Sequence, residues 1–584
     1  MKNTLKKAVA LLLVLVFVLS LTACGKKGGE EGEPAPVEIV VDDTPAAEAQ
    51  QEVDVEAYNA DSATIYDDAL GEFYATYQKA NETDDVSTKY ALMAIAEAKL
   101  QEAALMIPIY SRGGNYAIGR VAPYTVSPSL WGNDQNRFQM ALVTTEPLTT
   151  EDRDALKGLW KDLAGTGTYL AEAKAYLEGK GYTLKDTYSL TYNSDPVTFD
   201  TLSTSRAADA EITDMTYDRL FEYDVENVLQ PAIATGYTVS DDELTYTFTI
   251  REGVEWVDSQ GRKVADLTAD DYVAGIQHAM DAQGGLEYLY GAGYGYIAGA
   301  DDYIADPSIG FDAVGVKAVD DYTLEITLSQ PNSYFNTMWT YSIFAPMSRS
   351  YYESKGGKFG VDFDAAAEDY TYGTTADDIA YCGPCLITSI TAENSIVYTA
   401  NPTYWNADGI NIHSITMLYN DGSDPTKAYY DMQEGTIDAC GLNSSALEIA
   451  KGDGWFDKCE YVTSNDATSF MGFYNLNRTA FSNATDNTLG ISTQTVTDAQ
   501  RTGLAMKNVH FRRALSFAFD RVTYNAQSVG DELAAASLRN SYVPGNFVSL
   551  ENDVTVDING TSTTFPAGTY YGEIMQAQIG RAHV

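Results

Sequence analysis

Residues 381–385 of the chain, YCGPC, contain two cysteines separated by a glycine and a proline. Cys382 and Cys385 at this spacing could carry out thiol–disulfide exchange, in which a low-pKa thiolate attacks a disulfide. Such a thiolate needs the N-terminus of a helix directly after the motif. The following residues, LITSITAENSIVYTA, instead alternate as a strand does. We therefore do not predict a thiol oxidoreductase from this motif, but keep that activity as an alternative interpretation of the protein.

The sequence lacks several other common catalytic and metal-binding motifs. The sequence has no nucleophile elbow, no P-loop and no glycine-rich dinucleotide fingerprint. Its four histidines lie far from one another in sequence, and no second C-x-x-C pair occurs. We therefore predict no cofactor, no metal site and no enzymatic activity.

The amino-acid composition indicates how many domains the chain can form and which classes of partner it can bind. With 45% apolar and 12% aromatic residues, the chain can build two or three domains with apolar cores. The formal net charge of −46 argues against nucleic acid as a partner, because such a field repels polyanions.

The first residues indicate export. Lysines at positions 2, 6 and 7 precede an apolar run over 8–23, which predicts a signal peptide over residues 1–23. The run closes on LTAC, which resembles the lipobox of bacterial lipoproteins and implies that Cys24 becomes the lipidated first residue. The alternative is an ordinary secretory signal in which Cys24 is incidental. A Gly-, Pro- and Glu-rich stretch over 24–54 is typical of a flexible tether.

Periodicity predicts helices first and strands later. Apolar spacing predicts a helical hairpin over 66–103, and MIPIYSRGGNYAIGRVAPY indicates two short strands around a Gly-Gly turn. A second helical stretch is expected over 150–178. Period-two patterns then predict strands over 244–250 and 324–328, and Thr268 is the expected N-cap of a helix between them. The order is mixed α/β without a regular βαβ repeat.

Several segments carry a family resemblance. YSLTYNSDPVTFDTL, LTYTFTIREGVEWVDSQGRKVADLTADDYVAGIQHAMD, NPTYWNAD, SFMGFYNLNR and KNVHFRRALSFAFDR occur in this order within 184–540. Together they resemble the family 5 extracellular solute-binding proteins, the oligopeptide and dipeptide receptors of ABC importers. Where this chain has CGPC, the family typically has a Gly-Pro-Tyr turn, so Cys385 stands where an aromatic residue is usual.

The resemblance implies a bilobed α/β fold of the type II periplasmic-binding-protein class, with an extra subdomain and mixed sheets flanked by helices. The first lobe is expected over 184–464, with an accessory subdomain at about 218–341, and the second lobe begins over 465–578. A strand over 469–475 is expected to cross between the lobes, where a hinge closes the cleft on the ligand.

The expected ligand is a peptide, and the expected partners are the permease subunits of an ABC importer. The chain is expected to be a monomer, held by the lipid on Cys24 at the outer face of the bacterial cytoplasmic membrane. Another solute, such as a nickel chelate or an oligosaccharide, is the alternative within this fold. We expect the cleft to be lined by a loop after the first strand and by the crossing strand, although these residues could equally be turn and core residues. They are Asn193, Ser194, Asp195, Ser469 and Phe470.

The remaining cysteines could form disulfides, because the exported compartment permits them. Cys382, Cys385, Cys440 and Cys459 allow three pairings, and the sequence does not choose among them.

Both ends of the chain depart from the family pattern. The segment over 60–182 resembles the C-terminal part of family members, which implies a circular permutation. The alternative is that this segment forms an independent helical domain. The second lobe is expected to be incomplete, because the chain stops soon after a helix predicted to begin near Glu573. Residues 579–584, IGRAHV, match the translation of a common sequencing adapter, so we expect a non-native tail there.

Overall fold

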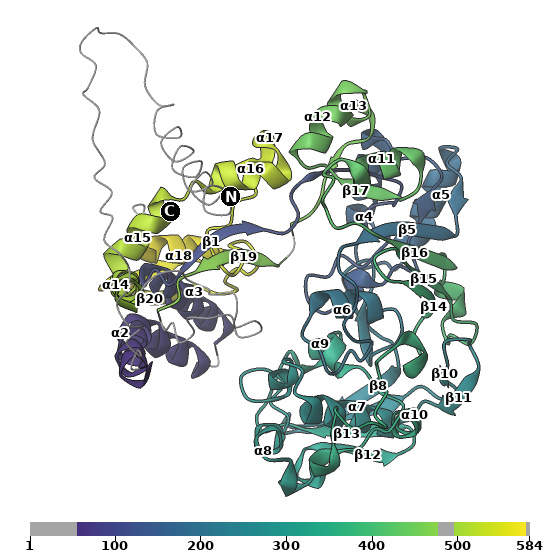
Figure 1. Cartoon of the computed structure of the whole chain (residues 1–584), viewed down its shortest axis with the longest axis horizontal. Coiled ribbons are helices and arrows are strands. Elements are labelled where there is room, and N and C mark those ends of the chain that lie inside the picture. The colour runs from purple at the N-terminus through teal and green to yellow at the C-terminus, as the bar shows by residue number, and fades with distance from the viewer. Residues whose placement is uncertain (1–54, 84, 466, 477–495, 580–584) are drawn as a thin grey trace, which may run out of the picture. The chain divides into compact units, whose positions relative to one another are not determined.

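The computed structural model shown in Figure 1 describes residues 55–83, 85–465, 467–476 and 496–579. All of these except 496–499 belong to one compact unit, Val55–Ser492 with Gln500–Val584. The predicted signal peptide, Cys24 and the tether lie outside the described residues, as do residues 580–584 of the expected tail. Within the described ranges, no helix is both long enough and apolar enough to cross a membrane.

The predicted helical hairpin is present near the start of the described chain. Its helices are α2 (Val55–Asn81) and α3 (Val86–Glu102), and Asp85 caps the second one through a side-chain hydrogen bond. Helix α3 packs on β20 (Val554–Ile558) and on α18 (Tyr571–Ile579), so the two ends of the described chain share one apolar core.

The two strands predicted around the Gly-Gly turn exist, but they do not pair with each other. Strand β1 (Met106–Ser111) runs antiparallel to β19 (Ser469–Phe473). Strand β2 (Tyr116–Gly119) pairs with β17 (Ala439–Gly441) and β18 (Tyr461–Val462) in a separate sheet. The two strands were predicted correctly, but the Gly-Gly turn between them did not identify the partner of either strand.

Two antiparallel segments, 112–115 and 463–465, join these sheets, and we call them the connecting segments. The backbone amide of Gly114 donates to the carbonyl of Thr463 at 3.2 Å. Gly113 and Gly114 have φ values of 85° and 71°, a left-handed conformation that favours glycine. The connecting segments carry the chain from one sheet into the other, so β1 and β2 belong to different sheets.

A four-stranded sheet carries the first predicted strand of the family pattern. It contains β14 (Cys385–Thr391), β15 (Ser395–Ala400), β16 (Ser414–Tyr419) and β5 (Thr187–Tyr192), in that order. Strands β16 and β5 are parallel, and their last residues face each other in register. Both strands therefore end at the same edge of the sheet.

A second four-stranded sheet supports the largest apolar core. Its order is β12 (Val316–Asp320), β13 (Thr323–Thr327), β9 (Thr245–Ile250) and β8 (Ala234–Val239). Helix α7 (Ala269–Ala282) packs against it. The apolar faces predicted for β9 and β13 are buried, which confirms the period-two interpretation.

Local signals set the helix boundaries. The predicted N-cap, Thr268, precedes α7, and its backbone amide donates to the carboxylate of Asp271 at 2.9 Å. The helical stretch predicted over 150–178 is divided into α4 (Thr150–Asp162) and α5 (Tyr169–Gly179). Glycines in the left-handed conformation at 165 and 167 separate the two helices.

The remaining elements are short and complete a mixed α/β fold, which confirms the predicted fold class. The strands are β3 (Val143–Thr144), β4 (Leu184–Lys185), β6 (Phe221–Tyr223), β7 (Leu229–Pro231), β10 (Glu255–Val257), β11 (Lys263–Asp266) and β21 (Thr561–Phe565). The helices are α6 (Ala207–Thr213), α8 (Ala300–Ala305), α9 (Phe335–Met338), α10 (Arg349–Ser354), α11 (Lys427–Glu434), α12 (Ser444–Gly452), α13 (Phe456–Cys459), α14 (Val496–Lys507), α15 (Val509–Ala518), α16 (Arg521–Val529) and α17 (Asp531–Ala534).

Candidate ligand-binding site

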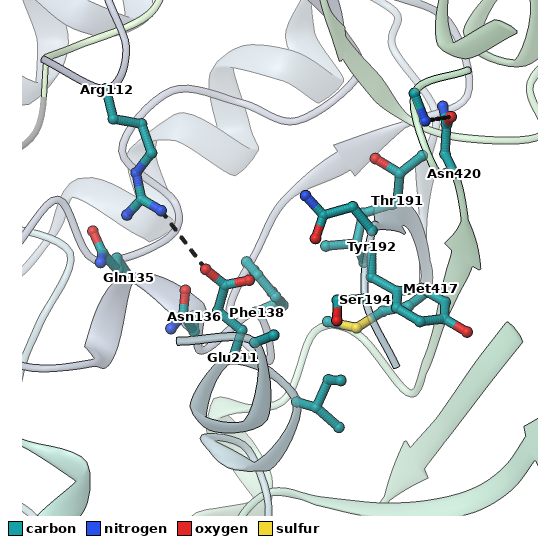
Figure 2. A pocket seen from close by; sticks show the side chains of 15 residues that line it. Arg112, Gln135, Asn136, Phe138, Thr191, Tyr192, Ser194, Glu211, Met417 and Asn420 are labelled. Carbon is teal, nitrogen blue, oxygen red and sulfur yellow. Dashed lines mark hydrogen bonds and ion pairs between the residues drawn. The ribbon is translucent and has the colours of Figure 1, made fainter. Parts of the chain in front are cut away.

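A pocket of about 580 Å³ lies beyond the ends of the parallel strands β5 and β16 (Figure 2). Its wall includes Leu190, Thr191 and Tyr192 from β5 and Met417 from β16. In open α/β sheets, ligands bind outside the carboxyl ends of parallel strands, because the loops that follow the strands leave a crevice there. The volume also falls within the range of about 300–1,000 Å³ that is usual for ligand pockets.

The loop after β5 was predicted to line the cleft, and the structure places part of it in this pocket. Asn193 and Ser194 belong to the wall. Asp195 lies behind them, where one carboxylate oxygen accepts from the Tyr192 hydroxyl and the other from the Glu393 backbone amide, each at 2.9 Å. The Asp195 carboxylate therefore holds the loop in place.

The predicted residues on the crossing strand lie elsewhere. The Ser469 hydroxyl donates to the carbonyl of Tyr542 at 2.9 Å, and the Phe470 ring stacks on Tyr110 with centroids 4.7 Å apart. Neither residue lines the pocket at the ends of β5 and β16. Their role in ligand binding stays a prediction.

Among the wall residues that the sequence did not predict, four polar or charged ones come from three segments that only the fold brings together. They are Arg112, Gln135, Asn136 and Glu211. Arg112 belongs to a connecting segment and Glu211 to α6, and their side chains point toward each other with Nη1 and Oε1 3.7 Å apart (Figure 2). Burial raises the pKa of Glu211, and Arg112 partly offsets that effect.

Buried charges lie beneath the wall residues Gln135 and Asn136. Asp134 and Arg137 flank these two residues in the sequence. Asp134 forms a buried ion pair with Arg219. Arg137 forms a buried ion pair with Asp218. All four charged side chains are at most 4% exposed. We call these residues, together with Asp214 and Glu222, the buried charge network.

Two carboxyl groups of the network have raised pKa values. Burial raises the pKa of Asp214 to about 6, although Arg219 opposes the shift. Burial also raises the pKa of Glu222 to about 7, against the opposing charge of Arg137 at 3.9 Å. The network therefore holds groups that change protonation near neutral pH.

The C-x-x-C motif does not have the features of a redox centre. Cys385 begins strand β14, as the alternation predicted, and no helix follows the motif. Burial raises the pKa of the Cys382 thiol well above its usual value and that of Cys385 to about 12, which disfavours both thiolates. All four cysteines named as disulfide candidates are free and buried in the structure, including Cys440 and Cys459.

The part of the chain that the structure describes contains no group of three or more His, Cys, Asp or Glu residues positioned to hold a metal ion. The pocket wall instead carries amide, hydroxyl and apolar side chains, with one guanidinium and one carboxylate. Such a wall can bind an uncharged or zwitterionic ligand through hydrogen bonds.

The chain is similar to known proteins over most of the fold described above. A family model for bacterial extracellular solute-binding proteins, family 5 Middle, matches residues 228–557. The oligopeptide-binding protein SarA of Streptococcus gordonii is 35% identical over 366 residues, covering 62% of this chain and 52% of SarA. The oligopeptide-binding protein AliB of Streptococcus pneumoniae is 35% identical over 389 residues, covering 66% of this chain and 55% of AliB.

Among solved structures, the substrate-binding domain of an oligopeptide ABC transporter from Bacillus anthracis is 26% identical, with a TM-score of 0.40. The match covers 46% of this chain and 48% of that chain. This chain spans about half the length of the curated relatives it matches. Because the family model matches more than half of the sequence, the chain belongs to the bacterial extracellular solute-binding proteins of family 5.

Proposed function

We propose that this protein is the extracytoplasmic receptor of an ABC importer and that it captures peptides. The observation that carries this proposal is the family match over residues 228–557. The relatives SarA and AliB are named oligopeptide-binding proteins, which makes peptides the first class of ligand to consider. The bilobed closure expected of the family would bury such a ligand between two lobes.

The pocket wall suits a peptide. Its amide and hydroxyl groups, among them Gln135, Asn136 and Ser194, can donate to peptide carbonyls and accept from peptide amides. Phe138 and Met417 add apolar surface for a side chain. A peptide needs both kinds of contact, because its backbone is polar at every residue and its side chains are often apolar.

Anchoring follows from the N-terminal pattern. We propose that residues 1–23 are removed, that Cys24 is lipidated, and that the receptor acts as a monomer at the outer face of the cytoplasmic membrane, where it delivers peptides to the permease subunits. A Cys24→Ala variant should then appear in the medium or in wash fractions. Membrane association as tight as that of the parent would contradict lipidation.

A thermal-shift screen of the purified protein against peptides, oligosaccharides and nickel chelates tests the ligand class. A ligand at a hundredfold its dissociation constant stabilises the fold by about 2.7 kcal/mol, so we expect a raised melting temperature with peptides alone. Gln135→Ala should weaken that shift, because Gln135 lines the pocket. Gln260→Ala, on the exposed surface, is the matched control. A shift with a sugar or a nickel chelate, and none with peptides, would replace the peptide by that solute.

A further inference from the structure

Arg112 and Glu211 are the two charged residues among those that line the pocket. Their charged groups lie 3.7 Å apart, which is longer than a normal hydrogen bond. The two side chains are 48% and 46% exposed, and ion pairs this exposed contribute little to stability. A ligand group of suitable charge can therefore replace either partner at small cost.

The other carboxylates near the pocket already have close partners. Asp195 accepts hydrogen bonds from Tyr192 and Glu393, and Asp209 accepts them from Thr204, Arg206 and the Val197 backbone amide. In the described part of the chain, the Glu211 carboxylate has the ion pair with Arg112 and accepts no hydrogen bond. Of these three carboxylates in and near the wall, Glu211 has the most bonding capacity left for a ligand.

We infer that Glu211 is a specificity-determining residue that binds a cationic group of the ligand, an ammonium or a guanidinium, in place of the Arg112 side chain. The inference rests on the proposed peptide-binding function and deepens it. A cation that donates to a carboxylate forms a stronger hydrogen bond than a neutral donor does. The Glu211 side chain is 46% exposed, so its carboxylate is accessible to such a cation.

The charge of the whole chain acts in the same direction. A formal net charge of −46 gives the protein a negative field that raises the rate at which cationic ligands arrive. The same field opposes an anionic ligand at Arg112. The pocket should therefore prefer peptides that carry a positive charge, either at a free amino terminus or on a lysine or arginine side chain.

Calorimetric titration with matched peptides distinguishes these two sources. The set contains an alanine peptide with one lysine, the same peptide with glutamine in place of lysine, and N-acetylated forms of both. If a side chain supplies the cation, replacing lysine by glutamine weakens binding about ten- to hundredfold, the usual effect of losing a charged hydrogen bond. If the amino terminus supplies it, acetylation has that effect instead.

Glu211→Gln should remove the preference, so that the variant binds the charged and the neutral peptide with affinities within about twofold of each other. Arg112→Gln should strengthen binding of the charged peptide, because it removes the competing cation. Glu252→Gln, an exposed carboxylate away from the pocket, should change neither. Circular dichroism of each variant shows whether it is folded.

The parent protein alone can overturn the inference, so it does not depend on the folding of a variant. If the parent binds charged and neutral peptides equally, or if Glu211→Gln weakens both equally, Glu211 does not select a cation and only this inference fails. If the parent binds no peptide of any charge, the proposed function itself fails.

Discussion

The side-chain amide of Asn136 donates a hydrogen bond of 2.7 Å to the carboxylate of Asp214. Asn136 lines the pocket, whereas Asp214 is fully buried in the charge network beneath it. The hydroxyl of Tyr217 donates to the other oxygen of Asp214 at 2.8 Å. The position of this part of the pocket wall therefore depends on the protonation and pairing of buried charges.

Asp214→Asn should change how stability depends on pH. Burial raises the pKa of Asp214 from its ordinary value of 3.8, which applies to the unfolded chain, to about 6 in the folded protein. The protonated carboxyl group therefore favours the folded state. That contribution is fully present below the unfolded pKa and is lost as the pH rises through about 6. The shift corresponds to about 3 kcal/mol.

Chemical denaturation of the parent and the variant between about pH 4 and about pH 8 measures this effect. The free energy of unfolding of the parent, relative to that of the variant, should fall by about 2–3 kcal/mol across the range. Glu222, whose raised pKa acts in the same direction, is present in both proteins and cancels. A difference that does not vary with pH would show that Asp214 does not titrate there.

Much of the fold could be predicted from local patterns. The alternation at Tyr246, Phe248 and Ile250 places three buried side chains on one face of β9, because a strand repeats every two residues. The pairing of β1 with β19 could not be predicted, since alternation indicates a strand but not its partner. The contact between Arg112 and Glu211 could not be predicted either, because it joins segments far apart in the sequence. The loop at Asn193 was found because it follows directly after a recognisable strand.

The effects of substituting Arg219 and Asp134 on the free energy of unfolding should be strongly coupled. Both side chains are buried, and removing one partner leaves the other charge without compensation. Arg219→Met and Asp134→Asn should each lower the free energy of unfolding by about 3–5 kcal/mol, and the double variant should lose much less than the sum. Either variant should also weaken ligand binding, because Asp134 directly precedes the wall residue Gln135.

The exposed pair Lys263 and Asp266 is the matched control for this double-mutant cycle. Its partners lie in solvent, where water screens the charges, so the two substitutions should be nearly additive. Additive losses at Arg219 and Asp134 would mean that each charge is stabilised by other groups of the network.

Gly113→Ala should destabilise the protein more than Gly253→Ala. Both glycines have a left-handed backbone, with φ values of 85° and 80°, so both substitutions incur the roughly 1–2 kcal/mol that an L-residue costs there. A Cβ at Gly113 would also lie 2.0 Å from the backbone oxygen of Ser464, whereas a Cβ at Gly253 would meet nothing within 4 Å. Urea unfolding of the two variants compares them, and equal losses would show that the connecting segments move apart without cost.

The thiols of Cys382 and Cys385 should be unreactive in the native protein. Burial disfavours both thiolates, and the Cys382 sulfur accepts a hydrogen bond of 3.4 Å from the backbone amide of Asp218. A thiol-specific chromogenic reagent should therefore react slowly until a denaturant is added. Concentrated guanidinium chloride provides the control, because it exposes every free thiol of the chain.

The same titration of thiols in denaturant tests whether Cys24 carries a lipid. The chain has five cysteines, four of which are free and buried in the structure. If Cys24 is lipidated or is removed with the signal peptide, four thiols react in denaturant, whereas five reacting thiols would show that Cys24 is retained and unmodified. Rapid reaction of the native protein, or insulin reduction that is lost in a Cys385→Ser variant, would restore the thiol oxidoreductase interpretation, because only an accessible thiolate can attack a disulfide.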